Sequence, residues 1–214
     1  MTRSVSIAIL AGGQSSRMGR DKALLELEPD RKPLLEIVLE RVQPLSDDVF
    51  VVASGRDAYA RFGAPVRPDL YPAAAVLGGI GSAIRHAAHD ECLVVSCDHP
   101  FLNPALLSRM LQTPGDWDVL VPVILGESRQ GGKAIRQTLH AIYARSCLPH
   151  IERAIANEEL QIVSFFGDVR IRAIGESEIA EYDPDFRSFF SVNTPEALAI
   201  ANRWRLNEAC RHSL

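Results

Sequence analysis

The sequence has 214 residues, of which 47% are hydrophobic and 23% are charged. This length and composition suit one globular domain with its own core, and they exclude a disordered or collagen-like chain. Acidic residues outnumber basic ones by 27 to 23, for a formal net charge of −4. The chain therefore lacks the positive charge that is typical of a general nucleic-acid binder.

Apolar, β-rich runs alternate along the chain with stretches of helical periodicity. The pattern predicts strands over residues 5–10, 49–53, 92–97, 118–123 and 169–174. It predicts helices that include residues 35–42, 80–87 and 148–155, and two more that begin with a capping residue before a proline, at 103–104 and 194–195. Residues 126–132 have the composition of a long loop. This alternation predicts an α/β fold, a three-layer α/β/α sandwich with a mostly parallel, Rossmann-like sheet, in a single domain over residues 1–214.

The cysteines indicate the compartment. The sequence has four, and none belongs to a C-x-x-C pair: Cys92, Cys97, Cys147 and Cys210. A disulfide framework or a zinc site is therefore not expected, and reduced thiols are. The longest uncharged stretch, residues 70–84, is too short for a membrane span, and no signal peptide is apparent. We expect a cytoplasmic protein with neither a membrane nor a nucleic-acid partner.

The first predicted strand leads into a glycine-rich, basic loop, LAGGQSSRMGRDK, over residues 10–22. It fits neither the Walker A pattern nor the G-x-G-x-x-G dinucleotide fingerprint. Its chemistry is still that of a phosphate site, because Gly12 and Gly13 let the backbone approach a ligand and present N–H groups to an anion. Arg17 and Lys22 add positive charge. At the end of the third predicted strand, the Asp98 carboxylate is suited to Mg²⁺, which prefers oxygen ligands and substrate phosphates.

Four segments in order resemble one family. They are LAGGQSSRMGRDK at residues 10–22, CDHPF at 97–101, LHAIYARSCLP at 139–149 and FSVNTPEAL at 190–198. Together they resemble the molybdenum cofactor guanylyltransferases, which belong to the nucleotidyltransferases with a glycosyltransferase-A-like fold. The resemblance extends over almost the whole chain.

The resemblance implies roles for particular residues. Lys22, Arg17 and Asp98 would be catalytic, with Asp98 as the magnesium ligand, and Asn193 would lie on the pterin side. The implied nucleotide-binding residues are Leu10, Ala11, Gly12, Gly13, Lys22, Asp69 and Asp98.

The chain departs from the family pattern at three places. The glycine–proline pair that usually precedes the second helix is Ala75-Val76 here, and residues 52–55 (VASG) lack an asparagine that relatives often carry. The first asparagine of the N-x-N-T-P motif is Ser191. The first two departures concern base recognition, and the third concerns the pterin side.

The implied reaction transfers GMP from GTP to molybdopterin, with Mg²⁺ as cofactor and pyrophosphate as product. The implied partners are GTP, molybdopterin or the molybdenum cofactor, and apo-molybdoenzymes or their chaperones. Two alternatives remain open. One is a cytidylyltransferase for molybdopterin or a nucleotidyltransferase for sugar or alditol phosphates, although the Gly12-Gly13 pair favours guanine over cytosine. The other is a non-catalytic adaptor that binds nucleotide or cofactor.

Overall fold

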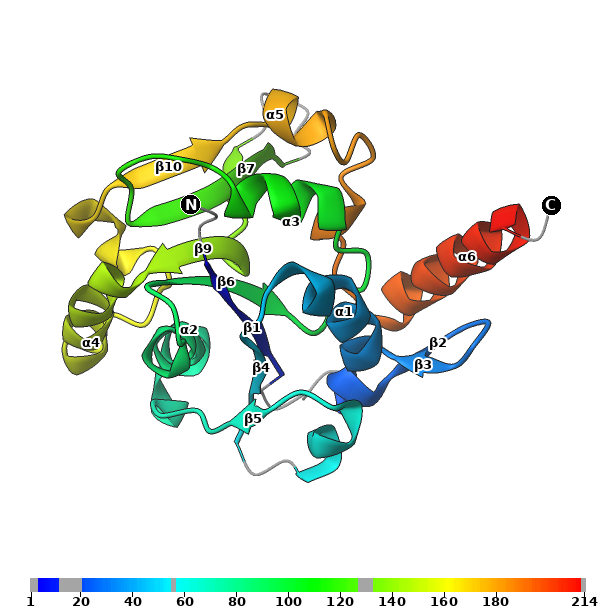
Figure 1. The fold of residues 1–214 in the computed structure, drawn as a ribbon, viewed down its shortest axis with the longest axis horizontal. Coiled ribbons are helices and arrows are strands. Elements are labelled where there is room, and N and C mark those ends of the chain that lie inside the picture. Colours follow the sequence, from blue (N-terminus) through cyan, green and yellow to red (C-terminus); the bar gives the residue numbers. More distant parts are fainter. Residues whose placement is uncertain (1–3, 12–20, 55–56, 127–132, 213–214) are drawn as a thin grey trace.

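A computed structural model describes residues 4–11, 21–54, 57–126 and 133–212. Its main sheet has the strand order β10-β7-β9-β6-β1-β4-β5, with β8 paired to β7 (Figure 1). The strands are β1 (Ser6–Leu10), β4 (Val49–Val52), β5 (Val66–Arg67), β6 (Glu91–Ser96), β7 (Val119–Leu125), β8 (Ala134–Arg136), β9 (His140–Ala144) and β10 (Ile171–Ile174).

Except for the two-residue strand β5, the parallel part of the sheet forms where the sequence predicts buried strands. β1 pairs in parallel with both β4 and β6, β4 pairs in parallel with β5, and β10 pairs in parallel with β7. The central strands β1, β4 and β6 are mostly apolar and buried, because helices cover both of their faces. The carboxyl ends of β1, β4 and β6 therefore meet at one edge, which is where ligands bind in sheets of this kind.

Helices cover the two faces of the sheet as predicted. On one face, α1 (Leu34–Val42), α3 (Pro104–Leu111) and α5 (Glu176–Ala180) pack on one core cluster. On the other, α2 (Ala75–His86) and α4 (Leu148–Ala156) pack on a second (Figure 1). Asn103 caps α3 as predicted, because its side chain accepts hydrogen bonds from Ala105 N and Leu106 N. The three-layer α/β/α prediction is confirmed.

Several strands, among them the two-residue strand β5, were not predicted. β9 inserts between β6 and β7 and is antiparallel to both, and β8 is antiparallel to β7. A hairpin of β2 (Glu26–Leu27) and β3 (Lys32–Pro33) was also not predicted. Of the expected loop over 126–132, only Gly126 is within the described residues.

A smaller core lies beside that hairpin. It joins the hairpin to α1 and to the last helix, α6 (Pro195–His212). Thr194 caps α6 as predicted, since its Oγ1 accepts a hydrogen bond from Ala197 N. Phe101, Phe190 and Trp204 meet in this core with ring centroids 4.7–6.2 Å apart. The packing fixes the segment between α5 and α6 against the turn that follows β6.

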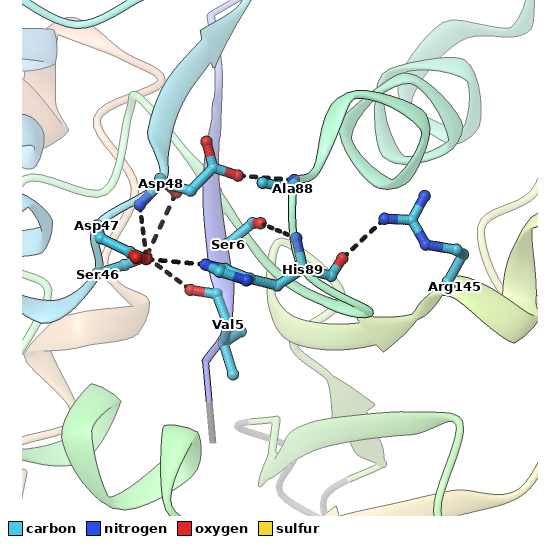
Figure 2. Close-up of polar contacts among 8 residues, drawn as sticks. All are labelled: Val5, Ser6, Ser46, Asp47, Asp48, Ala88, His89 and Arg145. Atoms are coloured by element: carbon cyan, nitrogen blue, oxygen red, sulfur yellow. Dashed lines mark hydrogen bonds and ion pairs between the residues drawn. The ribbon is translucent and has the colours of Figure 1, made fainter. Parts of the chain in front are cut away.

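Polar contacts tie together the edge of the sheet opposite the carboxyl ends (Figure 2). Asp48 accepts a hydrogen bond from Ala88 N at 2.9 Å, and Ser6 Oγ accepts one from His89 N at 3.1 Å. His89 also pairs with Asp47 at 2.8 Å, and Arg145 donates to His89 O at 3.0 Å. These contacts join the connection before β4 to the connection before β6. At this edge, the polar side chains serve mainly to hold loops.

Candidate functional site

The end of β1 is held rigidly between its two neighbours. Leu10 O accepts a hydrogen bond from Cys97 N at 3.1 Å, and Ala11 N donates to Val52 O at 3.0 Å. Ala11 is buried and Leu10 is partly buried. Leu10 and Ala11, two of the predicted nucleotide-binding residues, therefore lie at the carboxyl edge of the sheet. Gly12, Gly13 and Arg17, the other predicted residues of this loop, lie outside the described residues.

Lys22 begins a short 3₁₀ turn, Lys22–Leu24, that Asp21 caps through a hydrogen bond from Ala23 N. Tyr59, which is fully buried, donates its hydroxyl hydrogen to the Asp21 carboxylate, whose oxygens lie 2.8 and 2.9 Å away. The same hydroxyl lies 3.2 Å from Ala11 O. Tyr59 thus joins the residues on the two sides of the glycine-rich segment. By holding Asp21, it also fixes the position of the backbone from which Lys22 extends. Tyr59 belongs to no motif that could have indicated this role.

Asp98 lies in the turn directly after β6. Its Oδ1 atom is buried and has no hydrogen-bond partner among the described residues, and His99 Nδ1 lies 3.4 Å away. Its Oδ2 atom lies 4.0 Å from Lys22 Nζ. A buried carboxylate oxygen without a hydrogen-bond donor is costly unless a cation meets it.

The surroundings of this carboxylate suit a divalent cation that is coordinated jointly by the protein and a nucleotide, and not one that is enclosed by protein side chains alone. Within the described ranges, no group of three or more His, Cys, Asp or Glu side chains is placed to hold a metal ion. Mg²⁺ commonly binds through one or two carboxylates together with substrate phosphates. The donor set around Asp98 fits that mode, with the remaining oxygens coming from a nucleotide.

The segment before α6 crosses the Asp98 turn. Val192 N donates to Asp98 O at 2.8 Å. Asn193 Oδ1 accepts a hydrogen bond from Lys22 Nζ, and Asn193 Nδ2 donates to Ser191 Oγ at 2.8 Å. The structure thus brings together three predicted site residues, Lys22, Asp98 and Asn193. The division between nucleotide-binding and pterin-side residues stays a prediction. Lys22 from the first group and Asn193 from the second are in direct contact.

Asp69 lies apart from that cluster, in the loop before α2. Its Oδ1 accepts hydrogen bonds from Tyr71 N at 2.9 Å and from Ser82 Oγ at 2.8 Å. The loop packs tightly on α2, where a Cβ at Gly78 would lie 2.2 Å from Tyr71 O. Asp69 therefore has a structural role in this loop, and its nucleotide contact stays a prediction.

Two histidines lie at the Asp98 turn, of which His140 is buried and His99 is partly buried. His140 is 1% exposed, and its ring lies 4.8 Å from that of Phe189. In the part of the chain that the structure describes, neither ring nitrogen of His140 has a hydrogen-bond partner. Burial, with a smaller effect from His99, lowers the pKa of His140 to about 3. Burial also lowers the pKa of His99. Both rings are therefore neutral at pH 7, and they add no positive charge that would compete with a cation.

A model of the "MobA-like NTP transferase domain" matches residues 7–168. The chain belongs to the MobA-like NTP transferase family. As a member, it is a nucleotidyltransferase, and the part that carries Lys22, Asp69 and Asp98 lies inside the matched range. Asn193 lies beyond it.

Individual relatives cover the C-terminal segment as well. A probable molybdenum cofactor guanylyltransferase of Pelotomaculum thermopropionicum is 36% identical over 90% of this chain and 89% of its own. A molybdenum cofactor guanylyltransferase of Desulfosudis oleivorans is 31% identical over 92% of this chain and 94% of its own. The crystal structure of molybdopterin-guanine dinucleotide biosynthesis protein A from Archaeoglobus fulgidus superposes with a TM-score of 0.80 and 26% identity, covering 95% of this chain and all of that one. The nucleotidyltransferase fold and the family resemblance are confirmed.

Proposed function

We propose that this nucleotidyltransferase transfers GMP from GTP to the terminal phosphate of molybdopterin or its molybdenum-loaded form. The observation that carries the proposal is the cluster at the carboxyl edge of the sheet, where Lys22 Nζ bonds Asn193 and lies 4.0 Å from Asp98. Relatives named as molybdenum cofactor guanylyltransferases support the choice of substrates.

The reaction needs no protein nucleophile. A phosphate oxygen of the acceptor forms a bond to the α-phosphorus of GTP, the bond from that phosphorus to the bridging oxygen breaks, and pyrophosphate leaves with the electron pair. The protein therefore has to position two polyanions and offset their repulsion. Lys22 is proposed to supply a mobile positive charge at the triphosphate, and Asn193 is proposed to lie on the pterin side. The hydrogen bond from Lys22 Nζ to Asn193 Oδ1 supports a site in which the two substrates meet.

Asp98 would hold Mg²⁺ through its carboxylate, and the bound ion would offset the charge that develops on the phosphates. Arg17, Gly12 and Gly13 are proposed to bind phosphate, and Leu10, Ala11 and Asp69 to contact the nucleotide. We further propose that residues 1–214 form one domain, since a single sheet and its two helical layers involve most of the described chain.

The protein is proposed to act in the cytoplasm and to deliver its product to apo-molybdoenzymes or their chaperones. Cys92, Cys97 and Cys147 are free and buried, which suits a reducing compartment. Among the described residues, no helix has both the length and the apolar character needed to cross a membrane.

The test is a panel of GTP, CTP, ATP and UTP, each with and without molybdopterin in Mg²⁺, scored by pyrophosphate release. Release that requires both GTP and molybdopterin is expected. Preference for CTP would support the cytidylyltransferase alternative, and release with a sugar or alditol phosphate as acceptor would support the other enzymatic one. Binding of GTP without pyrophosphate release under any condition would support the non-catalytic adaptor.

A further inference from the structure

The amide of Asn193 has one of two possible orientations, and its neighbours determine which. A lysine ammonium group has only donors, so Lys22 Nζ can meet Oδ1 but not Nδ2. The Nδ2 group in turn donates to Ser191 Oγ at 2.8 Å. The Ser191 hydroxyl is thus the acceptor that matches the orientation Lys22 requires.

The position of Lys22 matters because a carboxylate lies nearby. Lys22 Nζ is 4.0 Å from Asp98 Oδ2, which is beyond hydrogen-bond distance. The side chains of Lys22 and Asp98 are 28% and 14% exposed, so water only partly screens their attraction. A small rotation of the flexible lysine side chain would bring the two groups into direct contact. Asn193 Oδ1 offers the ammonium group another acceptor and keeps that contact from closing.

We propose that Ser191 is a positioning residue which, by orienting the Asn193 amide, holds Lys22 away from Asp98 and leaves that carboxylate free for a divalent cation. This inference rests on the proposed function, in which Asp98 holds the metal. It assigns a role to a residue at which the chain departs from the family pattern. The hydroxyl acts through Asn193 and Lys22 and touches no substrate.

The backbone supports the same arrangement. Val192, between Ser191 and Asn193, donates its N–H to Asp98 O at 2.8 Å. Residues 191–193 therefore contact both the turn that carries the carboxylate and the lysine that would otherwise neutralise it. Outer-shell groups of this kind commonly tune how well a carboxylate binds a metal ion.

The experiment measures metal binding directly. Mn²⁺ is titrated into protein saturated with a GTP analogue that carries a methylene group between the α- and β-phosphorus, and binding is followed by the water-proton relaxation rate. Ser191→Ala should weaken Mn²⁺ binding by about tenfold, the low end of the range for outer-shell changes. Ser191→Thr, which keeps the hydroxyl, should restore it. Ser164→Ala is the matched control, since it removes a comparable hydrogen bond to Glu159 O at 2.9 Å.

A second comparison tests the route through the lysine. In a Lys22→Met background, no ammonium group can move onto Asp98, so Ser191→Ala should have no further effect on Mn²⁺ binding. A purely structural role for Ser191 would give the same loss in both backgrounds. Thermal unfolding of each variant without ligand checks that the fold is intact, and the conservative Thr variant provides a second measurement at the same position.

The outcomes separate this inference from the proposed function. If Ser191→Ala binds Mn²⁺ like the unchanged protein while Asp98→Asn does not bind it, the inference is overturned and the metal role of Asp98 stands. A loss with Ser191→Thr equal to that with Ser191→Ala would also overturn it. If Asp98→Asn binds Mn²⁺ as well as the unchanged protein, the metal role of Asp98 in the proposed function is itself wrong.

Discussion

The hydroxyl of Tyr59 lies 2.8 Å from one carboxylate oxygen of Asp21 and 2.9 Å from the other. The same hydroxyl lies 3.2 Å from Ala11 O, at the end of β1. One buried side chain therefore connects the strand that leads into the glycine-rich loop with the residue that precedes Lys22. Tyr59 thereby fixes Ala11 and Asp21, which lie on the two sides of the loop, relative to each other.

Replacing this hydroxyl should affect both stability and nucleotide binding. Tyr59→Phe removes a hydrogen bond to a charged group and should lower the free energy of unfolding by about 1.5–3 kcal/mol. It should also weaken GTP binding, because the position of Lys22 is less well defined. Urea unfolding and isothermal titration with GTP measure the two effects.

Tyr143→Phe is the matched control for Tyr59. The Tyr143 hydroxyl donates to Thr138 O at 2.7 Å. On β9, Tyr143 lies opposite Cys92 of β6, near the edge of the sheet away from the site. This variant should lose stability without a change in GTP affinity. Equal weakening of GTP binding in both variants would show that Tyr59 affects the site only through general stability.

Asp98 is expected to be essential for turnover. Asp98→Asn keeps the shape of the side chain but removes its charge, and it should reduce kcat by at least about tenfold, equivalent to roughly 1.4 kcal/mol in the barrier. Asp168→Asn is the control, since Asp168 forms an exposed ion pair with Arg153. Steady-state pyrophosphate release at saturating Mg²⁺ measures both, and unchanged turnover in Asp98→Asn would contradict the assignment.

Lys22 should determine affinity for the triphosphate. Lys22→Ala removes a charge-assisted contact and should weaken GTP binding by about 1.5–3 kcal/mol. Lys32→Ala is the control, because Lys32 pairs with Glu40 beside the β2–β3 hairpin. Isothermal titration with GTP compares the two variants. Equal affinity in the Lys22 variant and the unchanged protein would remove Lys22 from the nucleotide site.

The choice of base is expected to follow the paired glycines. At equal concentration in Mg²⁺, GTP should raise the melting temperature more than CTP does, because the tighter ligand stabilises the folded state more. Gly12→Ala adds a methyl group at the loop and should reduce the difference between the two nucleotides. Differential scanning fluorimetry gives both results, and a larger shift with CTP would favour the cytidylyltransferase alternative.

Stability should decrease in mildly acidic solution because of His140. Burial lowers the pKa of this ring in the folded state from its ordinary 6.5 to about 3. Between those values the unfolded chain binds a proton that the folded chain does not. The free energy of unfolding should therefore decrease as the pH falls below 6.5, by up to about 1.4 kcal/mol per pH unit.

Urea unfolding of metal-free protein at pH 4.5, 5.5, 6.5 and 7.5 measures this dependence. His140→Phe should reduce it to the part that the lowered pKa of His99 contributes, while His150→Phe, on α4, should leave it unchanged. Asp118 does not interfere in this range. Its hydrogen bonds with Arg170 lower the pKa of its carboxyl, so its stabilising effect is lost only below the ordinary value of 3.8. An identical slope for His140→Phe and the unchanged protein would contradict the prediction.

The parallel strands and most helices could be predicted because their signals are local. β1 and β6 are mostly apolar strands of five and six residues, and Asn103 is a cap followed by a proline. β9 was missed because its apolar run covers only residues 141–144, after His140, and no turn residue marks its start. Its insertion between β6 and β7 is decided by tertiary packing, to which the sequence pattern gives no direct guide.

The site likewise contains residues that a local motif indicates and residues that only the tertiary structure brings in. Lys22 and Asp98 lie in segments with recognisable motifs, so the sequence could suggest them. Tyr59 lies in a 3₁₀ segment, Asp57–Phe62, with no motif, and it reaches Asp21 only because the fold brings the two together. The hydrogen bond from Asn193 to Ser191 likewise depends on the orientation of an amide, which residue types alone do not determine.

Lys22 and Asn193 are separated by 171 positions in the sequence, yet they share a hydrogen bond. During synthesis, the early strands can begin to pair long before the segment around Asn193 has been made. The complete arrangement around Asp98 therefore forms only when nearly all of the chain has left the ribosome. A partly synthesised chain would have the sheet edge but not the amide that holds Lys22, so a nascent chain should not bind the metal–nucleotide complex as the finished protein does.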